Sequence, residues 1–434
     1  MVTQTYSLAA RRLATTVAAL SLAFAAFAQG GLRKDSPQRC GMDPMRLSQV
    51  DRVIEEAIAA KDIPGAVISV VRDDKIVYLK AYGDKSIVPE VEPMSTKTMF
   101  DLASVSKCVG TTLSFMQLIE NGQVRLTDNV DRYIPEFKPW KDPQTGESVD
   151  ITIRDLLTHS SGLAPYINTT AFIKEYGENT PDQLESYIAT EIRRNFRPGT
   201  DFMYSCLNFI TLQRILERLT GERLYEYAQR HVFDVLGLRH TYYFPLVGEP
   251  AVDNSAELSG LCAPTEVQDD GKPLVAQVHD PIARRIMSGN SGNAGVFSNA
   301  EDISVICAAI MNKGALKDKK GNTMESTRIL SPATVRLMTT IPPQNNPSVG
   351  RALGWDKKSA HSGLRGDLFN PETTIMHTGY TGTSIVIDLE SKTAIVLLTH
   401  RVHPQDKGSV GRLRALVANI VAGSCIQDLQ KGDR

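Results

Sequence analysis

Features that define several common classes of protein are scarce in this 434-residue chain. Its 48 Lys and Arg are balanced by 49 Asp and Glu, which leaves a formal net charge of −1 and no basic field to attract nucleic acid or anionic lipid. We therefore expect neither nucleic acid nor a membrane surface as a partner. The eight histidines show no H-E-x-x-H or similar ligand spacing, so we expect no metal and no other cofactor.

Cysteine is also sparse, and no two cysteines have C-x-x-C spacing. This pattern excludes a disulfide-rich scaffold and gives no indication of a zinc site. We interpret most of the thiols as small buried apolar groups. The six positions are Cys40, Cys108, Cys206, Cys262, Cys307 and Cys425.

A long apolar run occurs only near the start of the chain. Arg11 and Arg12 precede an apolar stretch over 13–27 that ends in Ala-Phe-Ala, the pattern of an export signal cut after Ala28. The alternative is a membrane anchor, but the stretch is shorter than the roughly 20 apolar residues that span a bilayer. We expect residues 1–28 to be a signal peptide and the mature chain to be periplasmic or secreted, with no membrane span.

The order of periodic segments predicts an α/β protein that is interrupted by helices. Residues 47–60 have helical periodicity, and the β-branched runs 66–72 and 75–80 are joined by Asp73-Asp74, which predicts a hairpin. From about 104 to 299 the chain alternates helical segments with polar, proline-containing loops. Later signals for two strand regions and a closing helix lie at 374–388, 393–398 and 410–422.

These signals define the expected domain organisation. The mature chain, 29–434, should form one α/β part from about 40–100 and 300–425, with a mostly helical insert at about 101–299.

A serine and a lysine lie three residues apart where a helical pattern begins. Ser104 and Lys107 should share one helix face, so that the lysine amine lies beside the serine hydroxyl. A serine activated by a neighbouring base is a nucleophile for acyl transfer. The alternative without catalysis is that Ser104 is a helix N-cap and Lys107 is a solvated charge.

Two further motifs follow in the sequence, at Tyr204-Ser205-Cys206 and at His377-Thr378-Gly379-Tyr380. With Ser104-x-x-Lys107 and the segment 152–163, this order resembles the serine β-lactamase and penicillin-binding-protein superfamily, in particular its class C, D,D-peptidase and esterase branch. The resemblance covers nearly the whole mature chain. It implies an α+β fold in which an antiparallel sheet is flanked by the N-terminal and C-terminal helices.

The resemblance also implies the roles of the site residues. Ser104 would form the acyl-enzyme, and Lys107 and Tyr204 would handle its proton, with the formal base left open. Lowered pKa values of Lys107 and Tyr204 would let the two share a proton near neutrality. The amides of Ser104 and Tyr380 would hold the oxyanion. The substrate would lie along a strand lined by His377, Thr378 and Gly379, near Cys206.

Some of these residues also have a purely structural interpretation. Tyr204 would also suit a core aromatic, and His377 a strand residue with only a packing role. We interpret the loop at His159 and the Asp280 carboxylate as structural rather than catalytic.

Two departures from the family pattern affect the expected substrate. Cys206 stands where class C β-lactamases have an asparagine, so it offers no amide to a substrate. His377 replaces the lysine of K-T-G, so a fixed cation becomes a group that is mostly neutral at pH 7. Both changes point away from an efficient β-lactamase.

The function predicted from the sequence is an exported serine hydrolase that acts on D-amino-acid peptides or small esters and amides, as a D-Ala-D-Ala carboxypeptidase or an esterase does. The alternatives are a class C-like β-lactamase and a non-catalytic protein that binds cell-wall peptide or assembles with itself. The oligomeric state is left open. The topology that the resemblance implies would also bring Cys40 and Cys425 together, and an oxidising compartment would allow a disulfide between them.

Overall fold

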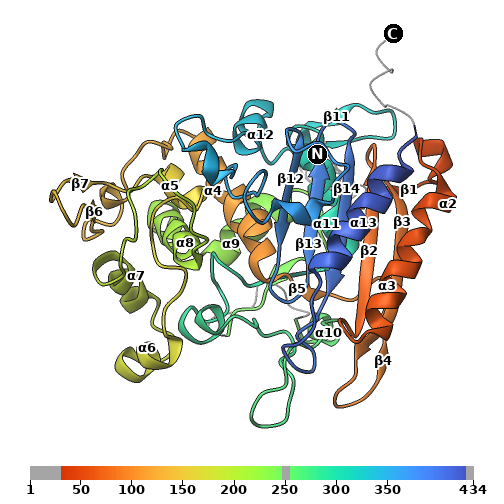
Figure 1. The fold of residues 1–434 in the computed structure, drawn as a ribbon, viewed down its shortest axis with the longest axis horizontal. Helices are drawn as coiled ribbons and strands as arrows, with labels where there is room; N and C mark the ends of the chain where they lie inside the picture. The colour runs from red at the N-terminus through yellow and green to blue at the C-terminus, as the bar shows by residue number, and fades with distance from the viewer. Residues whose placement is uncertain (1–30, 247–254, 427–434) are drawn as a thin grey trace, which may run out of the picture.

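The computed structural model describes residues 31–246 and 255–426 of the chain. A sheet covered by helices forms one half of the molecule, and a mostly helical half lies beside it (Figure 1). The predicted signal peptide, 1–28, lies outside the described residues. Within the described residues, no helix combines the length and apolar character needed to cross a membrane.

The main sheet has seven strands and is antiparallel except for one short edge pair. The predicted hairpin forms its centre, where β2 (Gly65–Arg72) pairs with β3 (Lys75–Ser86). On the other side of β2, the chain adds three late strands in the order β14 (Thr393–Thr399), β13 (Ser384–Asp388) and β12 (Thr374–Thr378). The short strands β1 (Arg33–Lys34) and β4 (Glu92–Pro93) both pair with β3.

Both faces of this sheet are covered, which explains why its central strand is apolar throughout. All eight residues of β2 are buried. The helices α3 (Gln49–Ala59) and α13 (Gly411–Ser424) pack together on one face, whereas α11 (Ala300–Met311) packs against β2 and β14 on the other (Figure 1). Alternate residues of β2 therefore join two different cores, with Ile68 on the α3 side and Val67 on the α11 side.

The helical half is built from short helices that pack around α8, the longest of them. Eleven of the fifteen residues of α8 are buried. The helices of this half are α4 (Leu113–Glu120), α5 (Ile153–Leu157), α6 (Thr169–Tyr176), α7 (Pro181–Thr190), α8 (Cys206–Thr220) and α9 (Leu224–Ala228).

Short elements complete the described fold. The remaining helices are α2 (Pro44–Leu47), α10 (Ser255–Gly260) and α12 (Pro332–Met338). There are also three small sheets. In the first, β9 (Val296–Ser298) lies between β5 (Phe100–Asp101) and β8 (Tyr242–Tyr243); the other two pair β6 (Trp140–Lys141) with β7 (Ser148–Val149) and β10 (Leu316–Lys317) with β11 (Thr323–Met324).

The α+β fold class expected from the sequence is confirmed, but the helix that begins at Ser104 is less regular than expected. Ala103–Val105 form a 3-10 turn and Lys107–Thr112 a π-helix, and α4 follows. The Thr112 hydroxyl donates to the Lys107 carbonyl at 2.7 Å, an i to i+5 link that accompanies the wider turn.

The predicted disulfide is absent, and all six cysteines are free. The segments do meet, because Met42 and Cys425 form an antiparallel bridge. That register places Met42, not Cys40, opposite Cys425, whose sulfur lies 3.9 Å from the Thr393 hydroxyl.

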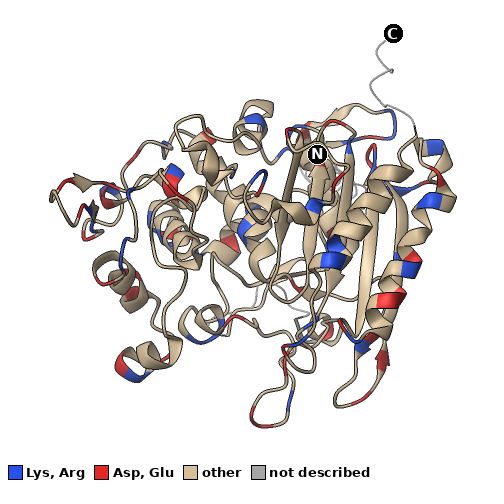
Figure 2. Ribbon diagram, viewed as in Figure 1, with Lys and Arg blue, Asp and Glu red and all other residues tan. Residues whose placement is uncertain are grey.

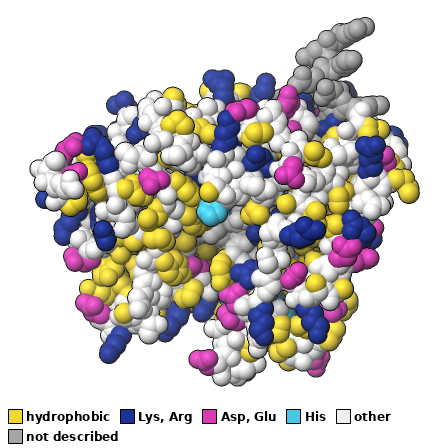
Figure 3. Space-filling view, in the orientation of Figure 1, with side chains coloured by type: hydrophobic (Ala, Val, Ile, Leu, Met, Phe, Trp, Pro, Cys, Tyr) yellow, Lys and Arg dark blue, Asp and Glu magenta, His cyan; other side chains and the backbone are white. Residues whose placement is uncertain are grey.

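Charged residues are interspersed over the described ribbon, with no region of one sign (Figure 2). On the face shown in Figure 3, hydrophobic side chains gather mainly over the helical half. The sequence-based expectation of no nucleic-acid partner agrees with this mixed surface, and it stays a prediction.

Candidate active site

The turn that presents Ser104 is held by a buried carboxylate. Ala103 adopts φ +46°, a conformation that costs a non-glycine residue about 1–3 kcal/mol and therefore needs support. Asp101 gives that support, since its Oδ1 accepts from the Ala103 amide at 2.8 Å and its Oδ2 from the His279 amide at 2.7 Å. Ser104 is partly exposed, whereas Ala103 and Val105 on either side are buried. The turn thus offers one hydroxyl to the solvent side.

Lys107 lies directly behind this hydroxyl and is fully buried. Its Nζ donates to Ser104 Oγ at 3.0 Å, to the Asn293 carbonyl at 2.8 Å and to Cys206 Sγ at 3.6 Å. Three acceptors match the three hydrogens of an ammonium group. The ring of Tyr204 completes the enclosure, with its centroid 5.0 Å from Nζ.

The protonation states differ from those expected from the sequence. Burial lowers the pKa of Lys107, but interactions with Cys206 and Tyr204 raise it by more, so the pKa lies above the ordinary lysine value. Burial raises the pKa of Tyr204 by more than the charge of Lys107 lowers it. The expectation of two lowered pKa values was wrong. For Lys107 the interactions with Cys206 and Tyr204 outweigh burial, and for Tyr204 burial outweighs the charge of Lys107. At rest the pair is an ammonium and a neutral phenol.

Tyr204 is positioned by the loop that the sequence predicted to be structural. The His159 ring lies against the Tyr204 ring, with centroids 4.3 Å apart, and His159 Nδ1 accepts from the Ser205 amide at 3.1 Å. Burial holds the pKa of His159 well below its usual value, which keeps this nitrogen available as an acceptor. His159 therefore fixes the second motif without lining the pocket.

The strand β12 forms the opposite wall and ends in the His-Thr-Gly motif. His377 is 3 % exposed, and its Nδ1 lies 3.0 Å from the Thr378 carbonyl. Burial, together with the charges of Arg351 and Lys107, holds the pKa of His377 well below 6.5. The neutral histidine expected at this position is confirmed.

Close contact joins the strand to the serine turn. A Cβ added to Gly379 would clash with Thr383 Oγ1 and the Leu102 carbonyl. The Thr383 hydroxyl donates to that same carbonyl, at 2.8 Å. The third motif therefore needs glycine because the strand and the turn touch here.

Tyr380 follows the glycine and is 57 % exposed at the rim of the pocket. Its ring stacks on the His279 ring, with centroids 5.8 Å apart, and the guanidinium carbon of Arg401 lies 4.6 Å from the Tyr380 ring centroid. The Tyr380 hydroxyl donates to Asp406. These contacts hold the main chain of Tyr380 beside the serine turn, where an oxyanion amide was expected.

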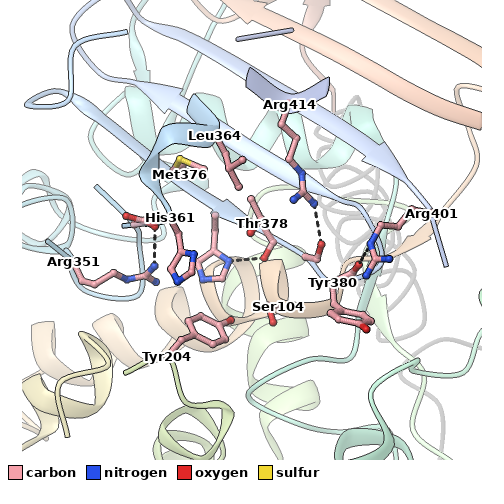
Figure 4. Close-up of a pocket in the computed structure, with 13 residues that line it drawn as sticks. Ser104, Tyr204, Arg351, His361, Leu364, Met376, Thr378, Tyr380, Arg401 and Arg414 are labelled. Atoms are coloured by element: carbon pink, nitrogen blue, oxygen red, sulfur yellow. Dashed lines mark hydrogen bonds and ion pairs between the residues drawn. The ribbon is translucent and has the colours of Figure 1, made fainter. Parts of the chain in front are cut away.

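The two walls enclose a pocket of about 380 Å³ (Figure 4). In this view Ser104 lies between Tyr204 and Tyr380, with Thr378 above it. Lys107 and Cys206 lie behind the pocket surface. The lining residues are Ser104, Tyr204, Arg351, Asp356, His361, Leu364, Met376, His377, Thr378, Gly379, Tyr380, Arg401 and Arg414.

Three residues that shape the site were not predicted from the sequence. Asp101 carries no motif, and Asn293 contributes only a carbonyl, which every residue has. The one signal near Asn293 is Gly292, where a Cβ would clash with the Phe209 carbonyl. Arg351 reaches the pocket only because Asp356, its partner in a tight hairpin, pairs with Met376 of β12.

In the described ranges, no group of three or more His, Cys, Asp or Glu could hold a metal ion. The groups that contact the Ser104 hydroxyl side of the pocket are Lys107, behind it, and Tyr204, in the lining.

An antiparallel sheet with a serine and lysine turn at its edge, facing a His-Thr-Gly strand, defines a serine hydrolase of the β-lactamase and penicillin-binding-protein type. The β-lactamase family model matches residues 50–419, and the chain belongs to this family.

Relatives from two bacteria support this placement. The chain is 32 % identical to an N-acetylmuramyl-L-alanine amidase of Bacillus subtilis (strain 168), over 82 % of this chain and 81 % of that protein. It is 30 % identical to a "Putative D-alanyl-D-alanine carboxypeptidase" of Escherichia coli (strain K12), over 86 % of each.

Solved structures share the fold. EstCE1, a hydrolase with promiscuous acyltransferase activity, superposes with a TM-score of 0.65 at 23 % identity, covering 87 % of this chain and 99 % of that one. The octameric penicillin-binding protein homologue from Pyrococcus abyssi gives 0.64 at 20 % identity, covering 87 % and 78 %.

Proposed function

We propose that this serine hydrolase is exported and cleaves amide bonds of small cell-wall peptides, including those with D-amino acids, through an acyl-enzyme on Ser104. The observation that carries the proposal is the 3.0 Å contact between Lys107 Nζ and Ser104 Oγ inside a pocket that Tyr204 also lines. A protein without catalytic activity would have no need of a buried ammonium group that contacts a partly exposed hydroxyl.

The resting protonation states favour different roles for Lys107 and Tyr204. Lys107, already an ammonium, stabilises the negative charge that develops on Ser104 Oγ as it attacks the carbonyl. The Tyr204 hydroxyl takes the serine proton while passing its own proton to the leaving nitrogen. Water then attacks the acyl-enzyme through the same relay, which returns the proton to Ser104.

The tetrahedral intermediate needs donors for its oxyanion. The amides of Ser104 and Tyr380 supply them in this proposal, and one such donor is commonly worth about 3 kcal/mol. The contact of Gly379 with the serine turn holds these two segments together.

Two further features support the substrate class and the location. The two named relatives are an amidase and a carboxypeptidase, whose names both denote amide cleavage in cell-wall material. Arg11, Arg12 and the apolar run 13–27 have the pattern of an export signal. A β-lactamase is less favoured, because Cys206 is buried against Lys107 and offers no amide to the substrate.

The proposal is tested with a panel of muramyl peptides, D-Ala-D-Ala peptides, nitrophenyl esters and nitrocefin. We expect peptide cleavage that Ser104→Ala abolishes, and mass spectrometry of the protein with penicillin should show an adduct on Ser104. Turnover that survives Ser104→Ala would contradict the proposal. Peptide binding without any turnover or adduct would favour a non-catalytic cell-wall binder.

A further inference from the structure

A second pocket adjoins the chain segment that supports the serine turn. It has a volume of about 410 Å³, and its lining includes Asn179, Gln277 and Arg284. Asn179 follows α6, which lies at the lower edge of the helical half (Figure 1). None of the described residues that line this pocket also lines the pocket of Ser104, so it is a separate candidate binding site.

Arg284 is a cation of this pocket with a free edge. Its Nη1 donates to the carbonyls of Val278 and His279, at 2.7 and 2.8 Å. Its Nε and Nη2 make no hydrogen bond or ion pair within the described residues, and unlike those of Arg351 they are not buried. These two nitrogens carry parallel N–H groups, and such a pair binds both oxygens of one carboxylate. The free edge is therefore accessible and suited to a planar anion.

The neighbouring Arg285 shows the same edge when it is occupied. Its Nε and Nη2 both contact Glu178 Oε1, at 2.8 and 2.7 Å. Glu178 therefore balances the charge of Arg285 within the pocket lining. Arg284 forms no such ion pair with any carboxylate of the described residues, so one positive charge of the pocket remains unpaired.

The surroundings of Arg284 do not compensate its charge fully. Burial lowers the pKa of its guanidinium below the ordinary arginine value, and the charge of Asp280 offsets only part of this effect. The Asp280 carboxylate has other partners, since it accepts from the Tyr166 hydroxyl at 2.6 Å and from the Ala283 amide at 2.8 Å. A carboxylate from outside the chain would provide the partner that Arg284 lacks.

The segment that anchors Arg284 also contacts the catalytic pocket. The His279 amide donates to Asp101, which supports the Ser104 turn, and the His279 ring stacks on Tyr380 at the pocket rim. Arg284 donates to the carbonyl of the same histidine. The two pockets therefore adjoin along this segment, and an extended peptide can reach both.

We propose that the second pocket binds a peptide carboxylate through the Nε and Nη2 edge of Arg284. Gln277 and Asn179 add amide groups to the lining, which suit the main chain of such a peptide. The inference rests on the proposed function, because it concerns the class of peptide on which the Ser104 pocket acts. The carboxylate belongs either to the acyl part of the substrate or to a separate peptide, and the experiment distinguishes these sources.

The first measurement uses matched substrates and the full chain. The substrates are p-nitroanilides of one, two or three D-alanines, each capped at its N-terminus with succinyl or with the neutral amide of that group, succinamoyl. We expect kcat/KM to favour the succinyl cap by about 10-fold at one of these lengths, because its carboxylate then reaches Arg284. A preference of this kind assigns the carboxylate to the acyl part of the substrate.

The second measurement needs no turnover. Calorimetry with the Ser104→Ala chain compares the binding of the same capped peptides, prepared as C-terminal amides instead of nitroanilides. We expect the succinyl forms to bind about 10-fold more tightly than the succinamoyl forms. A preference in binding alone, without one in kcat/KM, assigns the carboxylate to a separate peptide.

Variants then assign the preference to the residue. Arg284→Met should reduce it to less than about 3-fold. Arg284→Lys keeps a charge and a donor for the two carbonyls but lacks the paired N–H groups, so it should retain only part of the preference. Arg194 is a matched control, since it donates to backbone carbonyls and lines neither pocket. Arg194→Met should retain the full preference.

Several results would overturn the inference. Equal kcat/KM and equal binding of the succinyl and succinamoyl forms at all three lengths would do so without any variant. A full preference in Arg284→Met, or in Arg284→Lys where the methionine variant does not fold, would do so as well. Failure of the proposed function looks different, because turnover would then survive Ser104→Ala or be absent while Arg284-dependent binding persists.

Discussion

The two walls of the pocket differ in how completely their polar groups are paired. On the serine wall, Lys107 has an acceptor for each of its hydrogens, and Asp101 uses both of its oxygens. On the strand wall, Arg351 leaves Nε and Nη2 unpartnered and His377 leaves Nε2 unpartnered, among the described residues. The difference indicates that the polar groups around Ser104 are held by hydrogen bonds within the protein, whereas the strand wall contains buried nitrogens without such bonds.

Removing the cation of the serine wall should have the largest effect. In Lys107→Gln the charge that faces Ser104 Oγ is lost, so we expect kcat/KM for a nitrophenyl ester to fall by about 10³-fold. Lys357 is the matched control, because it is also buried and donates to one backbone carbonyl, at 2.9 Å, but does not line the pocket. Comparable losses in Lys107→Gln and Lys357→Met would mean that Lys107 acts only in folding.

Separating the two walls should have the next largest effect. In Gly379→Ala the added Cβ meets Thr383 Oγ1 and the Leu102 carbonyl, so the strand has to move away from the serine turn. A displacement of this kind near the reacting atoms costs about 10²-fold in kcat/KM. Gly363 has nothing within 4 Å of an added Cβ, so Gly363→Ala should stay near wild type. Equal activity of the two variants would disprove the contact between the walls.

The neutral state of His377 predicts a pH dependence of stability. The pKa of His377 in the folded protein lies well below 6.5, the value for the unfolded chain, because the fold favours the neutral ring. This preference adds to the stability of the folded protein above about pH 6.5, and the added stability is lost as the pH falls below that value. The slope is about 1.4 kcal/mol per pH unit for each such histidine. Denaturant unfolding between pH 7 and 5 should show a shallower slope for His377→Gln.

His361 provides the control for that measurement, since it is exposed and belongs to the same pocket. His361→Gln should keep the wild-type slope. The buried histidines His159, His400 and His403, whose pKa values burial also lowers, contribute to the slope that remains in His377→Gln. An identical slope in wild type and His377→Gln would show that His377 is already charged in the folded state.

The smallest effect is expected for the weakest acceptor of the serine wall. Cys206 Sγ lies 3.6 Å from Lys107 Nζ, and a serine hydroxyl there can also accept. Cys206→Ser should therefore change kcat/KM by less than about 3-fold, because it exchanges one neutral acceptor for another. A loss as large as that of Lys107→Gln would give Cys206 a direct role in the chemistry.

Local signals account for the parts of the fold that were correct from sequence. The hairpin at 66–80 has β-branched runs around Asp73-Asp74, and both aspartates adopt positive φ in the turn. The contact of Ser104 with Lys107 depends on a three-residue spacing. The 3-10 turn that contains Ser104 and the π-helix that begins at Lys107 keep the two side chains together, as an α-helix would. The disulfide was wrong because strand register, which residue spacing does not specify, places Met42 opposite Cys425.

The amino-acid sequence by itself determined the family, the order of the motifs and the pairing of Ser104 with Lys107, because these depend on near neighbours in the chain. Only the tertiary structure decided the charge of Lys107 and the burial of Arg351 Nε and Nη2 without a hydrogen-bond partner among the described residues. The reason is physical: a pKa depends on burial and on acceptors such as the Asn293 carbonyl, 186 residues from Lys107 in the chain, that the fold brings together.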